Sequence, residues 1–399
     1  GSHSPKTFLQ QDLVILSPGV SPILKIFEYA RSQGIKITGE FEFAQGFIKE
    51  PMVGVTGTNG KTTVARLAEA MLKNSGITCW VGGSNERPLT DYLRFNEKTQ
   101  VVIIEVSAFM LEHTESFNPS NIVFTNLAEN HLDRYRSMEE YINAKRRVFR
   151  NTNQMTTSIL NADDNAVVEL ARDPAVQRGK IFYFSRKQAL EPQIMNIGGA
   201  VNIADEVRVR TGPDVEVFNV KNIKMRGKHS IENVMAALLV SREHGATKEA
   251  IQKTIDTFEN LPHRIEYVRK VRGAIFYNDS KATNVHAVLR SLDTFDENVI
   301  LIMGGKDTNL NYEPLRNMIK RKVKTLILVG EAKERINREL GDFSETFLIG
   351  TFEEAVLIAF HKTRIGDIVL LSPGCSSHDM FDSYEERGDY FKQIIKKFQ

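Results

Sequence analysis

The stretch Val53-Gly-Val-Thr-Gly-Thr-Asn-Gly-Lys-Thr-Thr63 decides the fold of the chain around it. A short apolar run ends in a glycine-rich turn, and a helical pattern follows at once, with Gly76 as its expected C-terminal stop. The apolar face of this helix consists of Val64, Leu67, Ala68, Met71 and Leu72. A strand, a loop and a helix in this order form the context in which a glycine-rich loop binds phosphate.

The residue types in this loop suit a polyphosphate. Gly57 and Gly60 let the backbone approach the ligand closely, while the first N–H groups of the helix and its dipole favour negative charge. Lys61 adds a positive charge for the outer phosphates, and the hydroxyl of Thr62 can bind Mg²⁺. Val55 stands where the common phosphate loop has its first glycine, so this loop is tighter. The predicted nucleotide-binding residues of the loop are Gly57, Thr58, Asn59, Gly60, Lys61, Thr62 and Thr63.

Composition and charge argue against several classes of protein. Lys and Arg total 52 and Asp and Glu total 50, so charge gives no support to a nucleic-acid or membrane role. Two cysteines are too few for a disulfide framework and suggest a reducing compartment, which we expect to be the cytoplasm. No apolar run is long enough to span a bilayer, and no signal peptide is visible. Residues 1–3 resemble the remnant of a cleaved tag.

Apolar runs and turn residues divide the 399 residues into three α/β parts. Residues 1–48 hold a fragment of a doubly wound unit. A buried strand is expected over 12–16, a helix over 23–33 and a short strand over 35–38.

Residues 49–261 are predicted to form a central domain with a mostly parallel sheet. Continuous apolar runs over 101–104 and 122–125 are typical of strands that are covered on both faces. A helix is expected over 138–149. Residues 156–225 contain short alternating runs with turn residues between them, which predicts antiparallel hairpins on the edge of the sheet.

Beyond residue 261 the alternation of strands and helices restarts, which predicts a second doubly wound, Rossmann-like domain over 262–399. Its strands are expected at 274–278, 299–303, 325–329 and 368–371.

Polar residues follow several of the predicted strands, where open parallel sheets bind their ligands. Glu105 ends a central strand, His131 follows the next one, and Asp279 ends the first strand of the last domain. Because Mg²⁺ takes oxygen ligands and usually few from the protein, Glu105 beside Thr62 is a natural metal ligand. Ser377 lies in the serine-rich loop after the final strand.

A series of motifs carries a family resemblance. They are Thr56-Gly-Thr-Asn-Gly-Lys-Thr62, Glu105-Val-Ser-Ala-Phe-Met-Leu-Glu112, Asn126-Leu-Ala-Glu-Asn-His-Leu-Asp-Arg-Tyr135, Leu261-Pro-His-Arg-Ile-Glu266, Asn278-Asp-Ser-Lys-Ala-Thr-Asn284 and Leu371-Ser-Pro-Gly-Cys-Ser-Ser377. In this order, they resemble the Mur ligases of peptidoglycan synthesis, most closely those that add D-glutamate. The resemblance covers nearly the whole chain from Asp12 onward.

The resemblance implies an ATP-dependent amide ligase. ATP would phosphorylate the carboxylate of UDP-N-acetylmuramoyl-L-alanine, the amine of D-glutamate would attack the acyl phosphate, and phosphate would leave. Such chemistry needs cations and backbone donors rather than a nucleophilic side chain, and no Ser-His or Cys-His arrangement is apparent. The implied partners are therefore small molecules, with no nucleic acid and no membrane insertion, and the protein is expected to be a monomer.

The resemblance also implies roles for individual residues. Lys145 matches a lysine that the family carbamylates, which turns a cation into an oxygen anion for a second Mg²⁺. The implied catalytic residues are Lys61, Glu105, His131 and Lys145, and the implied metal ligands are Thr62, Glu105, His131 and Lys145. The further nucleotide contacts are Asn233, Arg264, Asp279 and Lys281. The implied substrate-binding residues are Ser84, Asn85, Ser107, Thr283, Ser377 and Tyr384.

This chain departs from the family's pattern at several positions. Thr308 stands where related ligases often have a basic residue for the glutamate side chain, so either Lys306 substitutes or the pocket is weaker. Ser230 stands where asparagine is common, and residues 83–86 differ from the usual substrate loop. Residues 1–48 resemble a shortened UDP-binding domain. Either the affinity for the UDP moiety is weak, or the natural chain is longer.

Alternative functions remain open on the sequence alone. One is another Mur-type ligase or a folylpolyglutamate-type ligase, which shares the phosphate loop and the modified lysine. Another is an ATP-binding homologue that has lost turnover. The motif 278–283 and the loop 372–377 favour the D-glutamate ligase.

Overall fold

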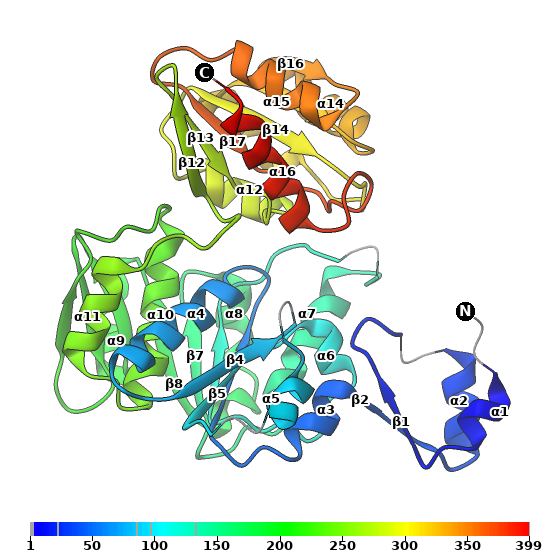
Figure 1. Cartoon of the computed structure of the whole chain (residues 1–399). Coiled ribbons are helices and arrows are strands. Elements are labelled where there is room, and N and C mark those ends of the chain that lie inside the picture. The colour runs from blue at the N-terminus through cyan, green and yellow to red at the C-terminus, as the bar shows by residue number, and fades with distance from the viewer. Residues whose placement is uncertain (1–3, 22–23, 85–86, 96–97, 132–133, 399) are drawn as a thin grey trace. The chain divides into compact units, whose positions relative to one another are not determined.

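The computed structural model describes residues 4–21, 24–84, 87–95, 98–131 and 134–398 (Figure 1). Contacts within the chain divide it into two compact units. The first unit comprises Gly1–Leu127, Glu139–Asn222 and Ile231–Thr257, and the second comprises Ala128–Met138, Ile223–Ser230 and Phe258–Gln399. In the described parts of the chain, no helix combines the length and the apolar character that crossing a membrane requires.

The first unit is built on a nine-stranded sheet with the order β11-β10-β9-β8-β7-β6-β3-β5-β4. Its strands are β3 (Met52–Thr56), β4 (Cys79–Gly83), β5 (Val101–Glu105), β6 (Asn121–Phe124), β7 (Thr157–Asn161), β8 (Lys180–Ser185), β9 (Gly199–Ile203), β10 (Glu206–Arg210) and β11 (Glu216–Asn219). Neighbouring strands run parallel from β4 at one edge of the sheet through β5, β3, β6, β7 and β8 to β9. The residues of β3, β5 and β6 are all buried, as expected of parallel strands covered on both faces.

Helices connect these strands or follow the last of them. They are α4 (Lys61–Asn74), α5 (Leu89–Phe95), α6 (Ala108–Glu112), α7 (Met138–Arg146), α8 (Asn165–Leu170), α9 (Glu191–Ile197), α10 (His229–Glu243) and α11 (Lys248–Thr257). Short 3₁₀ helices lie at Arg147–Phe149, Val176–Arg178 and Gln188–Leu190. The apolar face predicted for α4 is fully buried, and Gly76 adopts a φ of 77° just beyond the helix end, so both predictions are confirmed.

The prediction of antiparallel hairpins over 156–225 is only partly correct. β10 pairs antiparallel with both β9 and β11, and β11 forms the edge of the sheet. β7 and β8, however, are parallel members of the main sheet, so the hairpin prediction is wrong for them. The helix between them, α8, has six residues, which is too short for its periodicity to stand out from a turn.

The N-terminal segment of the first unit contains a small parallel pair of strands, β1 (Leu13–Leu16) and β2 (Lys36–Gly39). Its helices are α1 (Pro5–Leu9), α2 (Lys25–Ser32) and α3 (Glu40–Gln45). The strand expected over 12–16 is present as β1, but the expectation that it is buried is wrong, because only Leu16 of β1 is buried and Ile15 is 44% exposed. A two-stranded sheet offers too few neighbours to cover both faces.

The second unit is built on a six-stranded sheet with the order β12-β13-β17-β14-β15-β16, parallel except for β12. Its strands are β12 (Glu266–Val271), β13 (Ala274–Asn278), β14 (Val299–Gly304), β15 (Val323–Val329), β16 (Glu345–Leu348) and β17 (Ile368–Leu371). Its helices are α12 (Val285–Leu292), α13 (Arg316–Lys322), α14 (Lys333–Leu340), α15 (Phe352–His361) and α16 (Tyr384–Lys396), with 3₁₀ helices at Glu313–Leu315 and Gly341–Phe343.

Two hydrophobic clusters cover this second sheet, and their membership confirms the doubly wound prediction. One cluster includes Leu292 of α12 and Ile336 of α14, and the other includes Ala355 of α15 and Ile394 of α16. The sequence pattern predicts the four strands β13, β14, β15 and β17 at their observed places. It misses β12 and β16, which lie at the two edges of the sheet and carry exposed residues in place of an apolar run.

Candidate functional site

The glycine-rich turn after β3 has a backbone that only glycine fits. Gly57 and Gly60 have φ values of 129° and 91°, in the region that disfavours side chains. A Cβ on Gly57 would lie 2.0 Å from Oγ1 of Thr125, and a Cβ on Gly60 would lie 2.7 Å from Oδ1 of Asn233. The loop is therefore packed against the end of β6 and against α10, and α4 begins directly after it.

Thr125 and Asn126, which follow β6, fasten this loop through hydrogen bonds. The hydroxyl of Thr125 donates to the carbonyl oxygen of Asn59 at 2.6 Å. The Asn126 side chain accepts from the N–H of Asn59 at 2.9 Å and donates to its carbonyl oxygen at 3.0 Å, and the N–H of Thr58 donates to the Asn126 carbonyl oxygen at 2.9 Å. Sequence reasoning missed both residues, although their place directly after a central strand is a signal that could have identified them.

Lys61 lies over its own loop. Its Nζ donates to the carbonyl oxygens of Gly57 and Thr58 at 3.0 and 2.9 Å. These two carbonyl groups hold the ammonium beside the turn whose N–H groups open α4. The side-chain nitrogen of Lys61 therefore lies where the sequence predicts phosphate.

Thr62 and Glu105 form a buried pair of oxygen donors. The Thr62 hydroxyl donates to Oε2 of Glu105 at 2.9 Å, and the two residues are 7% and 1% exposed. The register of the sheet explains the contact, because β3 pairs with β5 so that Val55 lies opposite Glu105. The predicted neighbourhood of Glu105 and Thr62 is therefore present in the structure.

Lys145 of α7 reaches the carbonyl oxygen of Gly57 in the same turn. The residue is 1% exposed, its Nζ donates to the carbonyl oxygen of Gly57 at 2.8 Å, and it lies 5.1 Å from the ring centroid of Tyr141. Burial, and secondarily the charge of Lys61, hold the pKa of the Lys145 amine well below its usual value. Burial therefore disfavours the charged form of this amine.

Other predicted residues of the first unit lie near this turn or on the strands beside it. Thr58 is buried with its hydroxyl 3.3 Å from that of Tyr141, and Thr63 is half-buried in the first turn of α4. The backbone N–H of Ser84 donates to the carbonyl oxygen of Glu105 at 2.9 Å, and Ser107 caps α6. Asn85 lies outside the described residues.

His131 belongs to the segment Ala128–Met138, which groups with the second unit. It is exposed and has a φ of 58°. Over the described ranges, no cluster of three or more His, Cys, Asp or Glu side chains forms a ready-made metal site. His131 as a metal ligand therefore stays a prediction.

In the second unit, Asp279 points into the protein. Its carboxylate accepts hydrogen bonds from Oγ of Ser291 at 2.5 Å, Oγ of Ser372 at 2.8 Å and the N–H of Ile265 at 3.1 Å. Burial raises the pKa of this carboxyl to about 6, although its hydrogen bonds oppose the rise. Arg264, which precedes Ile265, lies between two residues with left-handed backbones, since φ is 62° at His263 and 48° at Ile265.

The predicted amino-acid pocket is braced by Arg387, which sequence reasoning missed. This arginine is fully buried, donates to Oγ and the carbonyl oxygen of Ser280 at 2.9 and 2.8 Å, and donates twice to the carbonyl oxygen of Cys375 at 3.2 Å. It therefore joins the loop that carries Lys281 and Thr283 to the serine-rich loop that carries Ser377.

The remaining predicted residues of this pocket lie on the same loops or on α16. Lys281 lies 3.8 Å from the ring centroid of Tyr384. Thr283 is half-buried and Ser377 is buried. The exposed residue Lys306 donates its backbone N–H to the carbonyl oxygen of Ser376 at 2.9 Å, which brings it beside the serine-rich loop.

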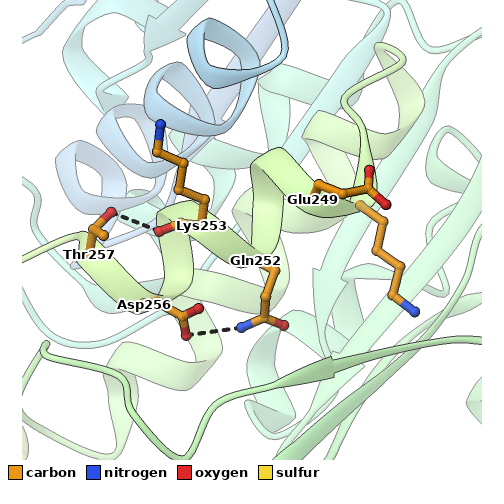
Figure 2. Close-up of a pocket in the computed structure, with 6 residues that line it drawn as sticks. Glu249, Gln252, Lys253, Asp256 and Thr257 are labelled. Carbon is orange, nitrogen blue, oxygen red and sulfur yellow. Dashed lines mark hydrogen bonds between the residues drawn. The ribbon is translucent and has the colours of Figure 1, made fainter.

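A depression along α11 contains none of the predicted site residues (Figure 2). It is lined by side chains of one helix, and some of its polar groups bond within that helix. Gln252 donates to Asp256 at 3.0 Å, and the hydroxyl of Thr257 donates to the carbonyl oxygen of Lys253 at 2.7 Å. We assign it no function.

Comparisons with known proteins identify the family. Residues 55–241 match the family described as Mur ligase middle domain, and residues 263–375 match the Mur ligase, glutamate ligase domain. A protein of Bdellovibrio bacteriovorus named UDP-N-acetylmuramoylalanine--D-glutamate ligase is 81% identical over 398 residues, which span 100% of this chain and 86% of that protein. A protein of the same name from Citrifermentans bemidjiense is 40% identical over 396 residues, which span 99% of this chain and 86% of the relative.

Solved structures agree with this fold. A pseudomurein peptide ligase type C from Methanothermus fervidus matches with a TM-score of 0.67 at 18% identity, covering 100% of this chain and 89% of that one. MurF from Acinetobacter baumannii matches with a TM-score of 0.67 at 14% identity, covering 94% and 82%. At these identities the structures support the fold alone, whereas the sequence relatives support membership. The chain belongs to the Mur ligase family, and within it to the UDP-N-acetylmuramoylalanine--D-glutamate ligases.

Proposed function

We propose that this enzyme joins D-glutamate to UDP-N-acetylmuramoyl-L-alanine at the expense of ATP, through an acyl-phosphate intermediate. The name of the relative that is 81% identical supports the two substrates. The observation that carries the chemistry is the grouping around one turn of the cation of Lys61, the buried amine of Lys145 and the Thr62–Glu105 oxygen pair.

Lys61 is assigned to the outer phosphates of ATP. Its ammonium now bonds two carbonyl oxygens of the loop, and these are weaker partners than phosphate oxygens. On nucleotide binding it exchanges them for the transferring phosphoryl group, where it stabilises the charge of the transition state. The N–H groups that open α4 supply further donors to the phosphates.

Thr62 and Glu105 suit Mg²⁺. A hydroxyl and a carboxylate, both oxygen donors and both buried, match the few protein ligands that this ion takes when substrate phosphates supply the others. When bound, the ion would offset the negative charge that keeps the substrate carboxylate away from ATP. We assign Thr62 and Glu105 to hold it and His131 to a further metal contact.

Lys145 is assigned to carbamylation. A neutral amine is a nucleophile, and the lowered pKa leaves the lone pair of Nζ available to attack the carbon of CO₂. A new N–C bond forms as one C=O π bond of CO₂ opens, one N–H proton leaves to solvent, and the product is a carbamate whose single negative charge is shared by two oxygens. Such a group would present oxygen ligands to a second Mg²⁺ beside the Gly57 turn.

The reaction then needs no covalent bond to the protein. A carboxylate oxygen of the L-alanyl group attacks the γ-phosphorus, the bond to the β-phosphate oxygen breaks, and ADP leaves. The amine of D-glutamate attacks the activated carbonyl carbon, the C–O bond to phosphate breaks, and the amide forms as the amine loses its proton. The protein contributes orientation and fixed charges.

We assign the amino acid to the second unit. Thr283, Ser377 and Tyr384 offer hydroxyl groups, and the carbonyl oxygen of Ser377 accepts hydrogen bonds from the N–H groups of Met380 and Phe381, which fixes its loop. The buried guanidinium of Arg387 fixes the two loops that carry these residues. Arg264 and Lys281 are assigned to nucleotide by the family resemblance. Asp279, with its carboxylate directed inward, is assigned to hold the backbone beside Arg264.

A phosphate-release assay with an amino-acid screen tests this function. The enzyme with ATP and Mg²⁺ is given UDP-N-acetylmuramoyl-L-alanine together with D-glutamate, L-glutamate, L-lysine or meso-diaminopimelate. We expect release that requires both the nucleotide sugar and D-glutamate. Release with another amino acid instead of D-glutamate would assign the enzyme to another Mur-type reaction, and an absence of release from folded protein that binds ATP would make it a homologue without turnover.

A further inference from the structure

Two ion pairs join the same strand and the same helix at opposite ends. Lys180, the first residue of β8, lies 3.5 Å from Glu243, the last residue of α10. Arg186, which follows the last residue of β8, donates from Nε to Oε1 of Glu232 in the first turns of α10 at 2.7 Å. The side chains of Lys180 and Glu243 are 46% and 20% exposed, whereas those of Arg186 and Glu232 are 29% and 5% exposed.

The Arg186–Glu232 pair continues into the phosphate loop through hydrogen bonds. Oε2 of Glu232 accepts from Nδ2 of Asn161 at 3.4 Å, and the same amide nitrogen donates to the carbonyl oxygen of Thr125 at 2.8 Å. The Thr125 hydroxyl donates to the carbonyl oxygen of Asn59, inside the loop, at 2.6 Å. A continuous chain of polar contacts therefore runs from the exposed end of Arg186 to the turn that opens α4.

The helix offers a second route to the same loop. Asn233 follows Glu232 on α10, and its Oδ1 occupies the space that a Cβ on Gly60 would enter. A shift or rotation of the first turns of α10 would move this amide against or away from the loop. Both routes begin at Glu232; the first ends at Asn59 and the second at Gly60.

The backbone of Arg186 is itself held in place. Its N–H donates to Oδ2 of Asp163 at 2.8 Å, while Ser185 donates to the other oxygen of the same carboxylate at 2.6 Å. Asp163 lies just beyond the carboxyl end of β7. The guanidinium thus projects from an anchored main chain toward α10, so its pair with Glu232 fixes the helix relative to the ends of β7 and β8.

Net stability alone does not account for this partly buried ion pair. Taking two charges out of water costs about as much as their attraction returns, and apolar side chains of similar volume are often equally stable there. What an ion pair with further hydrogen bonds adds is a defined geometry. Here the hydrogen-bonded pair fixes the positions of the phosphate loop and of Asn233.

We propose that Arg186 and Glu232 are positioning residues that hold the phosphate loop and Asn233 in the arrangement that binds ATP. This inference rests on the proposed function, because it concerns the nucleotide of that reaction. It assigns the two residues no contact with the substrate. They act through Asn161 and Thr125 on one side and through α10 on the other.

The test compares three variants of the full chain with a matched control. Arg186→Met breaks the buried pair, Arg186→Lys keeps the charge, and the double variant Arg186→Met/Glu232→Leu replaces both charges with apolar groups. Lys180→Met breaks the outer pair between the same two elements and serves as the control. ATP affinity is measured by calorimetry without the other substrates, KM and kcat by phosphate release, and unfolding by denaturant.

We expect Arg186→Met to weaken ATP binding and raise the KM for ATP about tenfold, with kcat changed much less; this matches the lower end of the effect of removing a hydrogen-bond partner that orients a metal ligand. The double variant should recover the stability of the wild type but keep the raised KM, because apolar groups restore packing without restoring the contact to Asn161. Arg186→Lys should lie between the wild type and Arg186→Met. Lys180→Met should bind ATP like the wild type.

Two results would overturn the inference. One is unchanged ATP affinity in both Arg186→Met and the double variant. The other is recovery of stability and ATP affinity together in the double variant, which would make the pair a purely structural contact. Failure of the wild-type protein itself to bind ATP would refute the proposed function instead, so the two failures are distinguishable.

Discussion

The side-chain nitrogen of Lys145 donates a hydrogen bond to the carbonyl oxygen of Gly57 at 2.8 Å, inside the loop predicted to bind phosphate. Lys61 donates to the same oxygen at 3.0 Å. Two lysine side chains therefore share one acceptor, and the buried one has its pKa lowered by burial and by the charge of the other. The two lysines differ in environment, because burial disfavours the charged form of Lys145 whereas Lys61 is only half-buried.

Lys61→Ala should lower kcat by a factor of about 10² to 10³, because it removes a cation from the transferring phosphoryl group. Its ammonium bonds the carbonyl oxygens of Gly57 and Thr58, which belong to its own loop, and we expect the fold to survive. Phosphate release and circular dichroism measure the two effects. A folded variant with normal turnover would refute the assigned role.

Lys145→Ala should lose most of its activity, and a short-chain carboxylic acid in the buffer should restore part of it. The reason is that an oxygen anion, rather than an amine, is required beside Gly57. Activity of the wild type should also fall as the pH drops below the lowered pKa of Lys145, since only the neutral amine reacts with CO₂. An unmodified Lys145 in a high-resolution crystal structure of the active enzyme with Mg²⁺ bound would contradict this account.

Gly60→Ala should abolish ATP binding. Its φ of 91° is unfavourable for alanine, and the added Cβ would lie 2.7 Å from Oδ1 of Asn233. Gly76→Ala is the matched control, because Gly76 has a φ of 77° just beyond the same helix but has nothing within 4 Å of its Cβ position. The control should cost about 1 kcal/mol of stability and still bind ATP. Equal loss of binding in both variants would attribute the effect to backbone strain alone.

Asp279 should make the stability of the second unit depend on pH. Its pKa is raised from 3.8 to about 6 in the folded protein, so the folded state binds a proton that the unfolded state has released. The contribution of this group is present below pH 4 and is lost as the pH rises through about 6, a difference on the order of 3 kcal/mol. Asp279→Asn should remove it. If the pH profiles of the unfolding free energy ran parallel for wild type and variant, the pKa of the Asp279 carboxyl would not differ between the folded and unfolded states.

Arg387→Met should destabilise the protein and raise the KM for D-glutamate more than that for ATP. The substitution leaves the carbonyl oxygens of Ser280 and Cys375 buried without their donor, a cost of about 1–3 kcal/mol for each such group. It also releases the two loops that carry the predicted amino-acid contacts. Steady-state kinetics with each substrate varied in turn measure the split. An equal change in both KM values would place the arginine in general folding rather than in this pocket.

The sequence predicts those parts of the fold that rest on strong periodicity. The apolar face of α4 and the strands β13 and β17 lie where the pattern places them, because a buried element must repeat its apolar residues at the period of its backbone. β7 and β8 were assigned to the wrong sheet arrangement, since pairing direction depends on the short helix between them and on distant partners. Edge strands such as β16 lack the signal altogether.

The residues of the candidate site likewise include some that the sequence predicts and some that only the tertiary fold shows. Glu105 beside Thr62 follows from the ends of neighbouring strands, which a sequence pattern can indicate. Arg387 and Glu232 could not be found in this manner, because a charged residue in a helix is usually solvated and only the tertiary fold shows that these two are buried. The inward orientation of the Asp279 carboxylate likewise depends on Ser291 and Ser372, from two other elements.

The central claim is that a carboxylate of the nucleotide sugar is phosphorylated by ATP before D-glutamate attacks it. The most direct measurement uses UDP-N-acetylmuramoyl-L-alanine whose carboxylate carries a heavy oxygen isotope, with ATP, Mg²⁺ and D-glutamate, followed by mass spectrometry of the released phosphate. This account predicts one labelled oxygen in each phosphate released and the matching loss of one labelled oxygen from the amide product. Phosphate without label, formed at the same rate as the amide, would contradict it.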